Sequence, residues 1–252
     1  MFFTNLLEAN MRTKNFRFNI NYYPKTESTN KDIWELFDQT KSNNLFVITD
    51  NQIAGKGRNN NTWLSVPNKS ITCSFLLKQI FNKMNFHALI IPLSIINGVK
   101  KFTGIELKIK WPNDIVYKNK KLAGILIESI KYKAEYLFNI GIGINVNEEI
   151  VDLPENLKQK AISLKLIKNK PIQREPLLAS IFNELDYLIN NANDNYIANQ
   201  WLKNCSHINQ NVEFKYKGQY TTGMFKTIND KGQAVIKCNS KEIEFDGAIQ
   251  LL

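Results

Sequence analysis

Two lysines bracket a short polar segment near the middle of the chain, in the sequence KWPNDIVYKNKKLAGILIES of residues 110–129. Lys110 opens this stretch, and Lys121 stands just before Gly124 in an apolar run. If the flanking segments pair as an antiparallel hairpin, both amines lie near one point, where a bound anion would relieve their repulsion. Gly124 would leave the backbone open to that ligand. The spacing favours an anion site, with a solvated hairpin tip as the alternative for either lysine alone.

A second cationic segment lies in the loop NQIAGKGRNNNTW of residues 51–63. Gly55 and Gly57 alternate there with Lys56 and Arg58. Glycines allow backbone N–H groups to approach an anion closely, and the two cations would neutralise it. Neither a Walker loop nor a complete GxGxxG fingerprint occurs in the chain. The loop predicts a phosphate or carboxylate cradle, with a plain flexible connection as the alternative.

The composition limits the chemistry that these residues can support. The chain of 252 residues has two histidines and three cysteines, and the cysteines lack CxxC spacing. A histidine-rich metal site, a Ser-His-Asp triad, a zinc knuckle and a disulfide framework are therefore disfavoured. The net charge of +10 favours an anionic partner, namely a nucleotide, a nucleic acid or an acidic protein. Lysine and asparagine are abundant throughout, however, so solvated faces account for the charge equally well.

The sequence carries no signal of membrane insertion or secretion. Its longest apolar stretch, residues 88–96, is interrupted by Pro92 and is too short to cross a bilayer. At the N-terminus the apolar residues precede the positive charges, which is the reverse of a secretory signal. We therefore expect a cytoplasmic protein without membrane partners. The sequence leaves open whether residues 1–10 belong to the fold or precede a start at Met11.

Apolar spacing and runs of β-branched residues predict the elements that position the two cationic segments. Thr29 and Asp32 predict a capping box at the start of the first helix. Helices are expected over residues 29–39, 86–101 and 174–190, with a shorter one ending at Trp201; strands are expected over residues 45–50, 70–78, 106–117, 121–130 and 134–147. Brief strands separated by turns follow from about residue 209.

These elements predict an α+β fold in two domains. Residues 1–205 would form a mixed, mostly antiparallel sheet with helices packed on one side. Residues 206–252 would form a small β-barrel or sandwich. At this length a catalytic domain and a small accessory domain can each build a core.

Five motifs now stand in order along the chain: STN at 28–30, AGKGR at 54–58, KWPND at 110–114, KLAG at 121–124 and GIGIN at 141–145. Together they resemble the biotin protein ligases, over roughly residues 20–252. The resemblance implies a class II synthetase-like catalytic domain and an SH3-like C-terminal barrel. It also implies an enzyme that activates biotin with ATP and Mg²⁺ and then transfers it to a lysine of a biotin carboxyl carrier domain.

The resemblance also assigns roles to individual residues. The residues implied in biotin binding are Ser28, Thr29, Asn30 and Gln52 at the ureido ring, Gly55, Lys56, Gly57 and Arg58 in the covering loop, Lys121 at the carboxylate, and Gly124 against the ring system. The residues implied on the ATP and adenylate side are Lys56, Arg58, Trp63, Lys110, Asn113 and Asn145. Lys121, Arg58 and Lys110 are expected to be catalytic. No protein side chain is expected to hold a metal; Mg²⁺ would arrive with ATP.

The chain departs from the family pattern in its covering loop. Lys56 replaces a customary arginine, and residues 59–62 read NNNT where glycine, arginine and lysine are usual. Lysine keeps the charge but loses the bidentate fork of arginine, so retention of the adenylate is in doubt. Some members carry an N-terminal helix-turn-helix domain, but only 27 residues precede Ser28. We therefore expect a ligase that does not bind DNA.

Two rival functions and one assembly state stay open at this point. A lipoate ligase would share the fold and the adenylating chemistry, although no arginine-rich segment leads into a triple glycine and a histidine here. A basic nucleic-acid-binding protein would explain the charge and the small β-module. Homodimers occur in the family that the chain resembles, so a homodimer is an open alternative.

Overall fold

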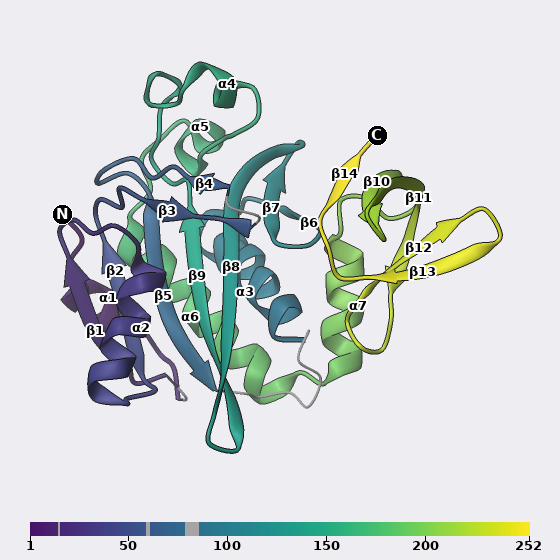
Figure 1. The fold of residues 1–252 in the computed structure, drawn as a ribbon. Coiled ribbons are helices and arrows are strands. Elements are labelled where there is room, and N and C mark those ends of the chain that lie inside the picture. Colours follow the sequence, from purple (N-terminus) through teal and green to yellow (C-terminus); the bar gives the residue numbers. More distant parts are fainter. Residues whose placement is uncertain (15, 59–60, 79–85) are drawn as a thin grey trace.

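The computed structural model describes residues 1–14, 16–58, 61–78 and 86–252. A seven-stranded sheet forms the centre of the larger domain, in the order β1-β2-β5-β9-β8-β7-β6 (Figure 1). Its strands are β1 (Asn19–Tyr23), β2 (Leu45–Thr49), β5 (Ile71–Lys78), β6 (Lys108–Lys110), β7 (Asp114–Tyr117), β8 (Lys120–Tyr132) and β9 (Glu135–Ile144). Only β1 and β2 pair in parallel among these neighbours. The expected mixed, mostly antiparallel sheet is confirmed.

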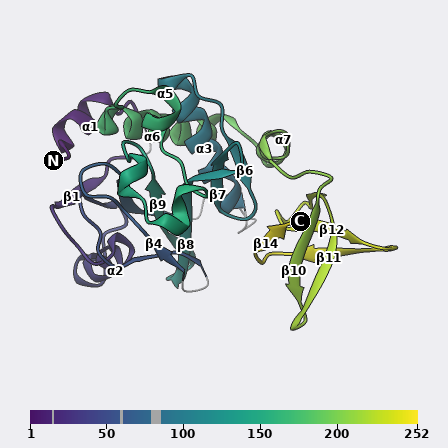
Figure 2. The ribbon, with the colours of Figure 1, turned by 90° about the horizontal axis from the view of Figure 1, so that it is seen from above.

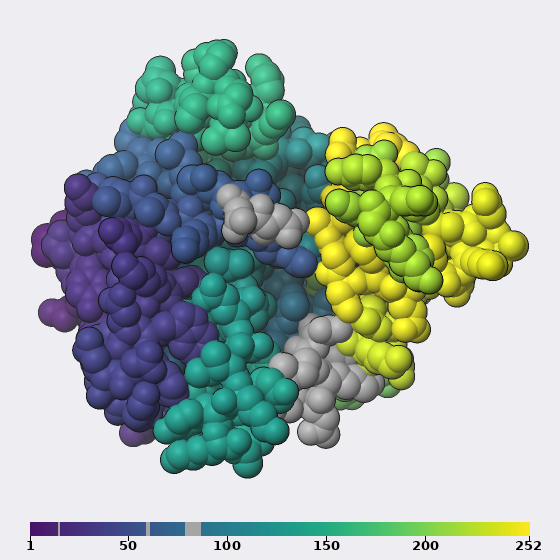
Figure 3. Space-filling view, in the orientation of Figure 1, coloured from purple at the N-terminus to yellow at the C-terminus, as the bar shows by residue number. Residues whose placement is uncertain are grey.

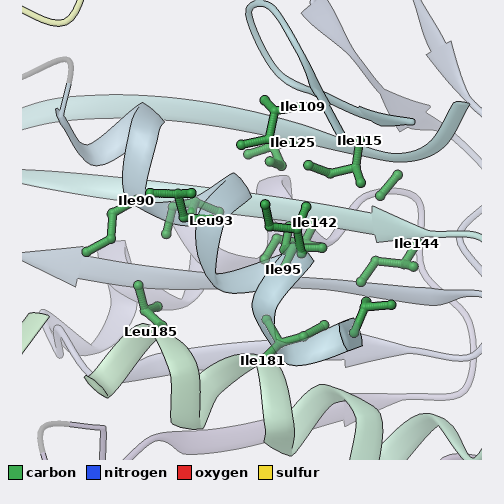
Figure 4. Close-up of a cluster of buried hydrophobic side chains, with 14 of the residues drawn as sticks. Ile90, Leu93, Ile95, Ile109, Ile115, Ile125, Ile142, Ile144, Ile181 and Leu185 are labelled. Atoms are coloured by element: carbon green, nitrogen blue, oxygen red, sulfur yellow. The ribbon is translucent and has the colours of Figure 1, made fainter. Parts of the chain in front are cut away.

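Helices cover the two faces of this sheet unequally. The long helices α3 (Phe86–Thr103) and α6 (Arg174–Asn191) pack on one face and form the larger core. Figure 4 shows Leu93 of α3 in one cluster with Ile142 of β9 and Ile181 of α6. The opposite face carries α2 (Thr29–Thr40), which packs against alternate residues such as Val47 and Leu76. The expected helical layer is thus formed by α3 and α6, and α2 adds a smaller layer on the other face.

The first residues of the chain belong to the fold. The helix α1 (Thr4–Asn10) packs against α6, and Phe2 and Leu7 are buried. The Phe2 backbone N–H donates to Asp50 Oδ2 over 2.9 Å, and Arg174 pairs with Asp50 Oδ1 at 2.9 Å. Residues 1–10 are therefore part of the packed domain, which the sequence had left open. The strand β1 was not anticipated.

The predicted strand over residues 106–117 is wrong as a single element. It divides into β6 and β7 around Pro112, which follows a cis peptide bond. Proline has no backbone N–H to give to a sheet ladder, so the chain turns at this point. A second tight turn joins β7 to β8, where Lys118 and Asn119 both have positive φ, as two-residue hairpins require. Two consecutive hairpins therefore stand where one was predicted.

Short elements connect β9 to α6 above the sheet in Figure 1. They are the 3-10 helix η2 (Ile150–Asp152) and the helices α4 (Glu155–Lys158) and α5 (Leu164–Lys168). The two-stranded hairpin of β3 (Gly55–Lys56) and β4 (Thr62–Trp63) lies across the front of β8 and β9. The covering loop predicted from the sequence is thus placed over the sheet.

A smaller domain follows α7 (Asp194–Asn204) and lies beside the sheet domain (Figure 2). It is a five-stranded antiparallel sheet in the order β13-β12-β11-β10-β14, as expected for a small β-module. The strands are β10 (Asn211–Tyr216), β11 (Gln219–Ile228), β12 (Ala234–Cys238), β13 (Lys241–Phe245) and β14 (Ile249–Leu251). The domain boundary at residues 205 and 206 stays a prediction. Within the described part of the chain, every helix is too short or too polar to cross a membrane.

Candidate active site

A cavity lies between the central sheet, the β3–β4 hairpin and the C-terminal domain. Most residues singled out from the sequence line it, although they come from six separate segments. The predicted residues in its wall are Ser28, Thr29, Asn30, Gln52, Lys56, Gly57, Arg58, Trp63, Lys110, Asn113, Lys121 and Gly124. Residues 59 and 60, part of the unusual NNNT segment, lie outside the described residues.

Two of the predicted site residues do not line the cavity. A Cβ added at Gly55 would lie 2.5 Å from Gln52 Nε2, so this glycine makes room for the glutamine. The side chain of Asn145 donates to the carbonyl oxygen of Ile162 over 3.1 Å and holds the loop after β9. Neither position supports direct contact with a ligand; the roles predicted for Gly55 and Asn145 remain predictions.

One end of the cavity is a network of neutral hydrogen bonds. The Thr29 backbone N–H donates to Gln52 Oε1 over 2.9 Å, and the Thr29 hydroxyl lies 2.6 Å from Ser74 Oγ. Ser74 donates in turn to Asn30 Oδ1 over 2.7 Å. The predicted capping box at Thr29 and Asp32 is wrong, because Ser28 is the N-cap and its side chain makes no capping bond. The Thr29 hydroxyl is instead engaged in the cavity wall.

Three glycines of β8 and β9 form the floor of the cavity. A Cβ at Gly141 would lie 2.0 Å from Asn30 Oδ1, and one at Gly143 would lie 2.2 Å from Trp63 Cε2. Such separations are far below ordinary contact, so each glycine accommodates a side chain from another segment. A Cβ at Gly124 on the neighbouring strand would lie 3.1 Å from Trp63 Cζ3, so this glycine also faces the Trp63 ring. The glycines of the GIGIN and KLAG motifs thus allow side chains of other segments to lie directly on the floor of the cavity.

The other end of the cavity is cationic. Lys121 Nζ lies 2.6 Å from Asp114 Oδ1, and both side chains are partly exposed. Lys110 is the strand partner of Asp114 in the β6–β7 pair. The two lysines therefore do reach one cavity, but through two successive hairpins that share Asp114 rather than through the single hairpin predicted. Asp114 is the counter-ion of Lys121.

The C-terminal domain, yellow in Figure 3, packs against the sheet domain and contributes residues to the cavity wall at the cationic end. The Trp111 indole N–H donates to the Gly247 carbonyl oxygen over 2.8 Å, and Arg58 Nη2 donates to that of Asp246 over 3.4 Å. Burial lowers the pKa of Arg58, while the nearby carboxylates of Asp114 and Asp246 oppose this shift. Ala248 and Ile249 also line the cavity. The smaller domain thus contributes part of the wall.

The joint between the two domains is itself buried. Ser206 donates its backbone N–H to the Ile109 carbonyl oxygen over 2.8 Å, next to Lys110. Burial, aided by the charge of Lys110, lowers the pKa of His207 to about 4. This imidazole is therefore neutral at physiological pH. The edge strand that carries Lys110 is fixed to the C-terminal domain at the same point.

Two buried polar atoms in the cavity wall have no hydrogen-bond partner among the described residues. They are the indole Nε1 of Trp63 and the hydroxyl of Thr72. Buried polar groups are rarely left unpaired, so both are suited to meet a ligand. Thr72 could not be identified from the sequence, because its exposure to the cavity depends on the register of β5 against β9.

The described part of the cavity wall has few side chains that could bind a metal ion. Among the described residues, no group of three or more His, Cys, Asp or Glu side chains could hold one. Asp114 is the one carboxylate among the described lining residues, and it is paired with Lys121. A magnesium ion would therefore take its ligands mainly from phosphate oxygens and water. The sequence alone did not assign a role to Asp114, because an aspartate after asparagine often serves only a turn.

Two family models match the chain. The model described as "Biotin/lipoate A/B protein ligase family" matches residues 22–147, and "Biotin protein ligase C terminal domain" matches residues 207–249. These two segments contain the cavity wall from Ser28 to Gly143 and the C-terminal turn that closes it.

Individual curated proteins are also similar to the chain in sequence. The bifunctional ligase/repressor BirA of Bacillus subtilis is 32% identical over 164 residues, which cover 64% of this chain and 50% of that protein. The biotin--[acetyl-CoA-carboxylase] ligase of Mycobacterium tuberculosis is 24% identical, with 87% and 83% covered. The chain thus spans about half the length of the first curated relative named here.

A solved structure is similar over almost its whole length. The biotin protein ligase of Aquifex aeolicus in complex with biotin and ATP superposes with a TM-score of 0.78 at 25% identity. The match covers 93% of this chain and 98% of that one. From the matched family model and the cavity formed by its motifs, the chain belongs to the biotin/lipoate A/B protein ligase family.

Proposed function

We propose that this protein is a biotin protein ligase, which forms biotinyl-5′-AMP and then biotinylates a carrier lysine. The observation that carries the proposal is the polarity of one cavity. Its neutral end presents Thr29, Asn30 and Gln52, and its cationic end presents Lys110 and Lys121. Biotin has the same polarity, with a ureido ring at one end and a carboxylate at the other. The match to a biotin protein ligase C-terminal domain supports biotin over lipoate.

In the first step, a biotin carboxylate oxygen attacks the α-phosphorus of ATP and pyrophosphate leaves. Both reactants are anionic, so the barrier contains their repulsion. Lys121 is placed to hold the carboxylate once it separates from Asp114, and Arg58 and Lys56 extend from the hairpin above. Charge that develops on the phosphate oxygens is stabilised by these cations. Magnesium bound by the ATP phosphates offsets further negative charge.

In the second step, the ε-amine of a carrier lysine attacks the carbonyl carbon of the mixed anhydride. The bond to the phosphate oxygen breaks, AMP leaves, and the amine loses a proton as the amide forms. The buried floor and the Trp63 cover shield the anhydride from water, which would otherwise hydrolyse it. The partner is a biotin carboxyl carrier domain, and the net charge of +10 favours an acidic one. We propose that the reaction takes place in the cytoplasm.

The proposal is tested with purified protein, biotin, ATP and magnesium. We expect biotin-dependent exchange of labelled pyrophosphate into ATP, followed by label transfer to a carrier domain. A carrier with its target lysine changed to arginine is the control. Exchange that depends on lipoate instead of biotin would reassign the protein to the other branch of its family. The absence of exchange with either acid would refute the adenylating function.

A further inference from the structure

A carboxylate lies beyond the neutral end of the cavity, on the same face of the sheet. In the β8–β9 register, Leu126 pairs with Gly141, and Glu128 pairs with Asn139. Successive pairs two residues apart point to one face, so Glu128 and Asn139 follow directly after the glycine floor. Neither residue lines the cavity as described. Both contact Asn30, which does.

Glu128 receives three N–H donors at one oxygen. Its Oε2 accepts from Trp34 Nε1 at 2.9 Å, from Asn30 Nδ2 at 3.3 Å and from Asn139 Nδ2 at 3.4 Å. Asn139 also donates to the Asn30 carbonyl oxygen over 2.8 Å. A carboxylate accepts hydrogen bonds and has none to donate. It therefore holds the Asn30 amide with its NH₂ group turned outward and its oxygen turned toward the cavity.

This orientation determines the direction of the next two hydrogen bonds. The inward oxygen of Asn30 accepts the single hydroxyl proton of Ser74 over 2.7 Å. Ser74 can then only accept in its 2.6 Å contact with the Thr29 hydroxyl, so Thr29 donates there. The Thr29 hydroxyl also lies 3.3 Å from Gln52 Oε1, but its one proton is directed to the shorter contact. Thr29 therefore offers only lone pairs to a ligand.

The neighbouring glutamine presents the complementary group. Gln52 Oε1 accepts the Thr29 backbone N–H over 2.9 Å, which leaves the Gln52 NH₂ group over Gly55. The wall thus offers an acceptor at Thr29 beside a donor at Gln52. A cyclic urea has N–H donors on either side of a carbonyl acceptor and fits this order. A dithiolane ring, as in lipoate, has neither group.

We propose that Glu128 is a positioning residue that sets the hydrogen-bond polarity of the neutral end through Asn30, Ser74 and Thr29. The inference rests on the proposed function and deepens it, because it makes the ureido N–H the group that the polarised chain recognises. Glu128 does not contact the substrate. Its effect is expected on biotin recognition and not on the chemical step.

The test is Glu128→Gln, whose amide can donate as well as accept and so no longer fixes the orientation of Asn30. We expect the KM for biotin in pyrophosphate exchange to rise about tenfold, with kcat within about twofold of wild type. Ser74→Ala, which breaks the same chain one bond closer to Thr29, should raise the KM similarly. Glu135→Gln, at the exposed start of β9, makes the same chemical change elsewhere on the hairpin and should alter neither constant.

A second readout separates polarity from simple packing. Wild type should discriminate against biotin methylated on a ureido nitrogen, and Glu128→Gln should narrow the ratio of the two KM values. A wild-type KM and an unchanged ratio in Glu128→Gln would overturn the inference while leaving the proposed function intact. A fall in kcat with an unchanged KM would overturn it as well. Absence of biotin-dependent exchange in wild type would instead overturn the proposed function and, with it, the inference.

Discussion

The two ends of the cavity are prepared for a ligand in different ways. At the neutral end, Thr29, Asn30 and Gln52 are held by hydrogen bonds to one another or to the strand beneath. At the cationic end, Lys121 is paired with Asp114, and its side chain is 41% exposed. The first end therefore needs little rearrangement to bind a neutral ring. The second must exchange one ion pair for another.

This difference indicates that the neutral end acts in substrate recognition and the cationic end in catalysis. A preorganised neutral end contributes the same binding energy to substrate and transition state, and so mainly sets the KM. Cations that face developing charge act more strongly in the transition state than in the ground state. Changes at the two ends should therefore affect different kinetic constants. The predictions below test this separation.

The largest effect is expected for Lys121→Ala. The change removes the cation nearest the predicted carboxylate position and takes from Asp114 its ion-pair partner. We expect pyrophosphate exchange to fall by about 10²- to 10³-fold at saturating biotin. Lys120→Ala removes the adjacent lysine, which does not line the cavity, and should leave exchange near the wild-type rate. Near-normal exchange in Lys121→Ala would remove this lysine from the catalytic step.

The next effect is expected for Gly141→Ala at the neutral end. The new methyl group would lie 2.0 Å from Asn30 Oδ1 and would displace this side chain from Ser74. Loss of two or three hydrogen bonds at about 1 kcal/mol each should raise the KM for biotin by roughly 30- to 150-fold. A thermal melt checks that the variant folds.

Gly143→Ala is the matched comparison on the same strand. Its methyl group would strike the Trp63 ring instead of Asn30, so it should disturb the cover and not the neutral end. We expect altered Trp63 fluorescence and faster loss of bound adenylate, with a smaller change in the KM for biotin. If both glycine variants changed the KM equally, the contributions of the neutral end and of the Trp63 cover to biotin binding would not be separable.

A smaller effect is expected for Lys56→Ala in the covering hairpin. Lys56 is exposed and lies in β3, so it can contribute charge to the adenylate without shaping the floor. The half-life of bound adenylate, measured by dilution into unlabelled substrate, should shorten by about tenfold or less. Lys56→Arg should lengthen it, because a guanidinium can grip the phosphate with two bonds. An unchanged half-life in both variants would exclude a retaining role for this residue.

The sequence motifs predicted which cations lie in the site, but not which carboxylate pairs with them. The hairpin spacing predicted that Lys110 and Lys121 meet, whereas the resemblance to the biotin protein ligases placed Lys56 and Arg58 in the same site. Asp114 lies in the same segment, yet its pairing with Lys121 depends on a division of the strand that only the folded turn shows. The main helices and strands were predictable from periodicity, whereas β1 was not.

Residues that support the site but lie outside its motifs could not be predicted from the sequence. Glu128 and Thr72 face the cavity side only because of the register between neighbouring strands, and a shift of one residue would turn them away. Ala248 reaches the wall through the docking of a second domain. Contacts of this kind are set by tertiary structure and leave no local pattern.

The smallest effect is expected at the contact between that second domain and the cationic end. Trp111→Phe keeps an aromatic ring but removes the indole N–H that donates to the Gly247 carbonyl oxygen. One neutral hydrogen bond contributes about 0.5–1.5 kcal/mol, so transfer to a carrier domain should slow by roughly two- to tenfold. The KM for biotin should not change, because the neutral end lies on a different part of the wall. A change in the KM alone would mean that the C-terminal turn contributes to biotin recognition. The separation between a recognition end and a catalytic end would then not hold for the part of the wall that the C-terminal domain supplies.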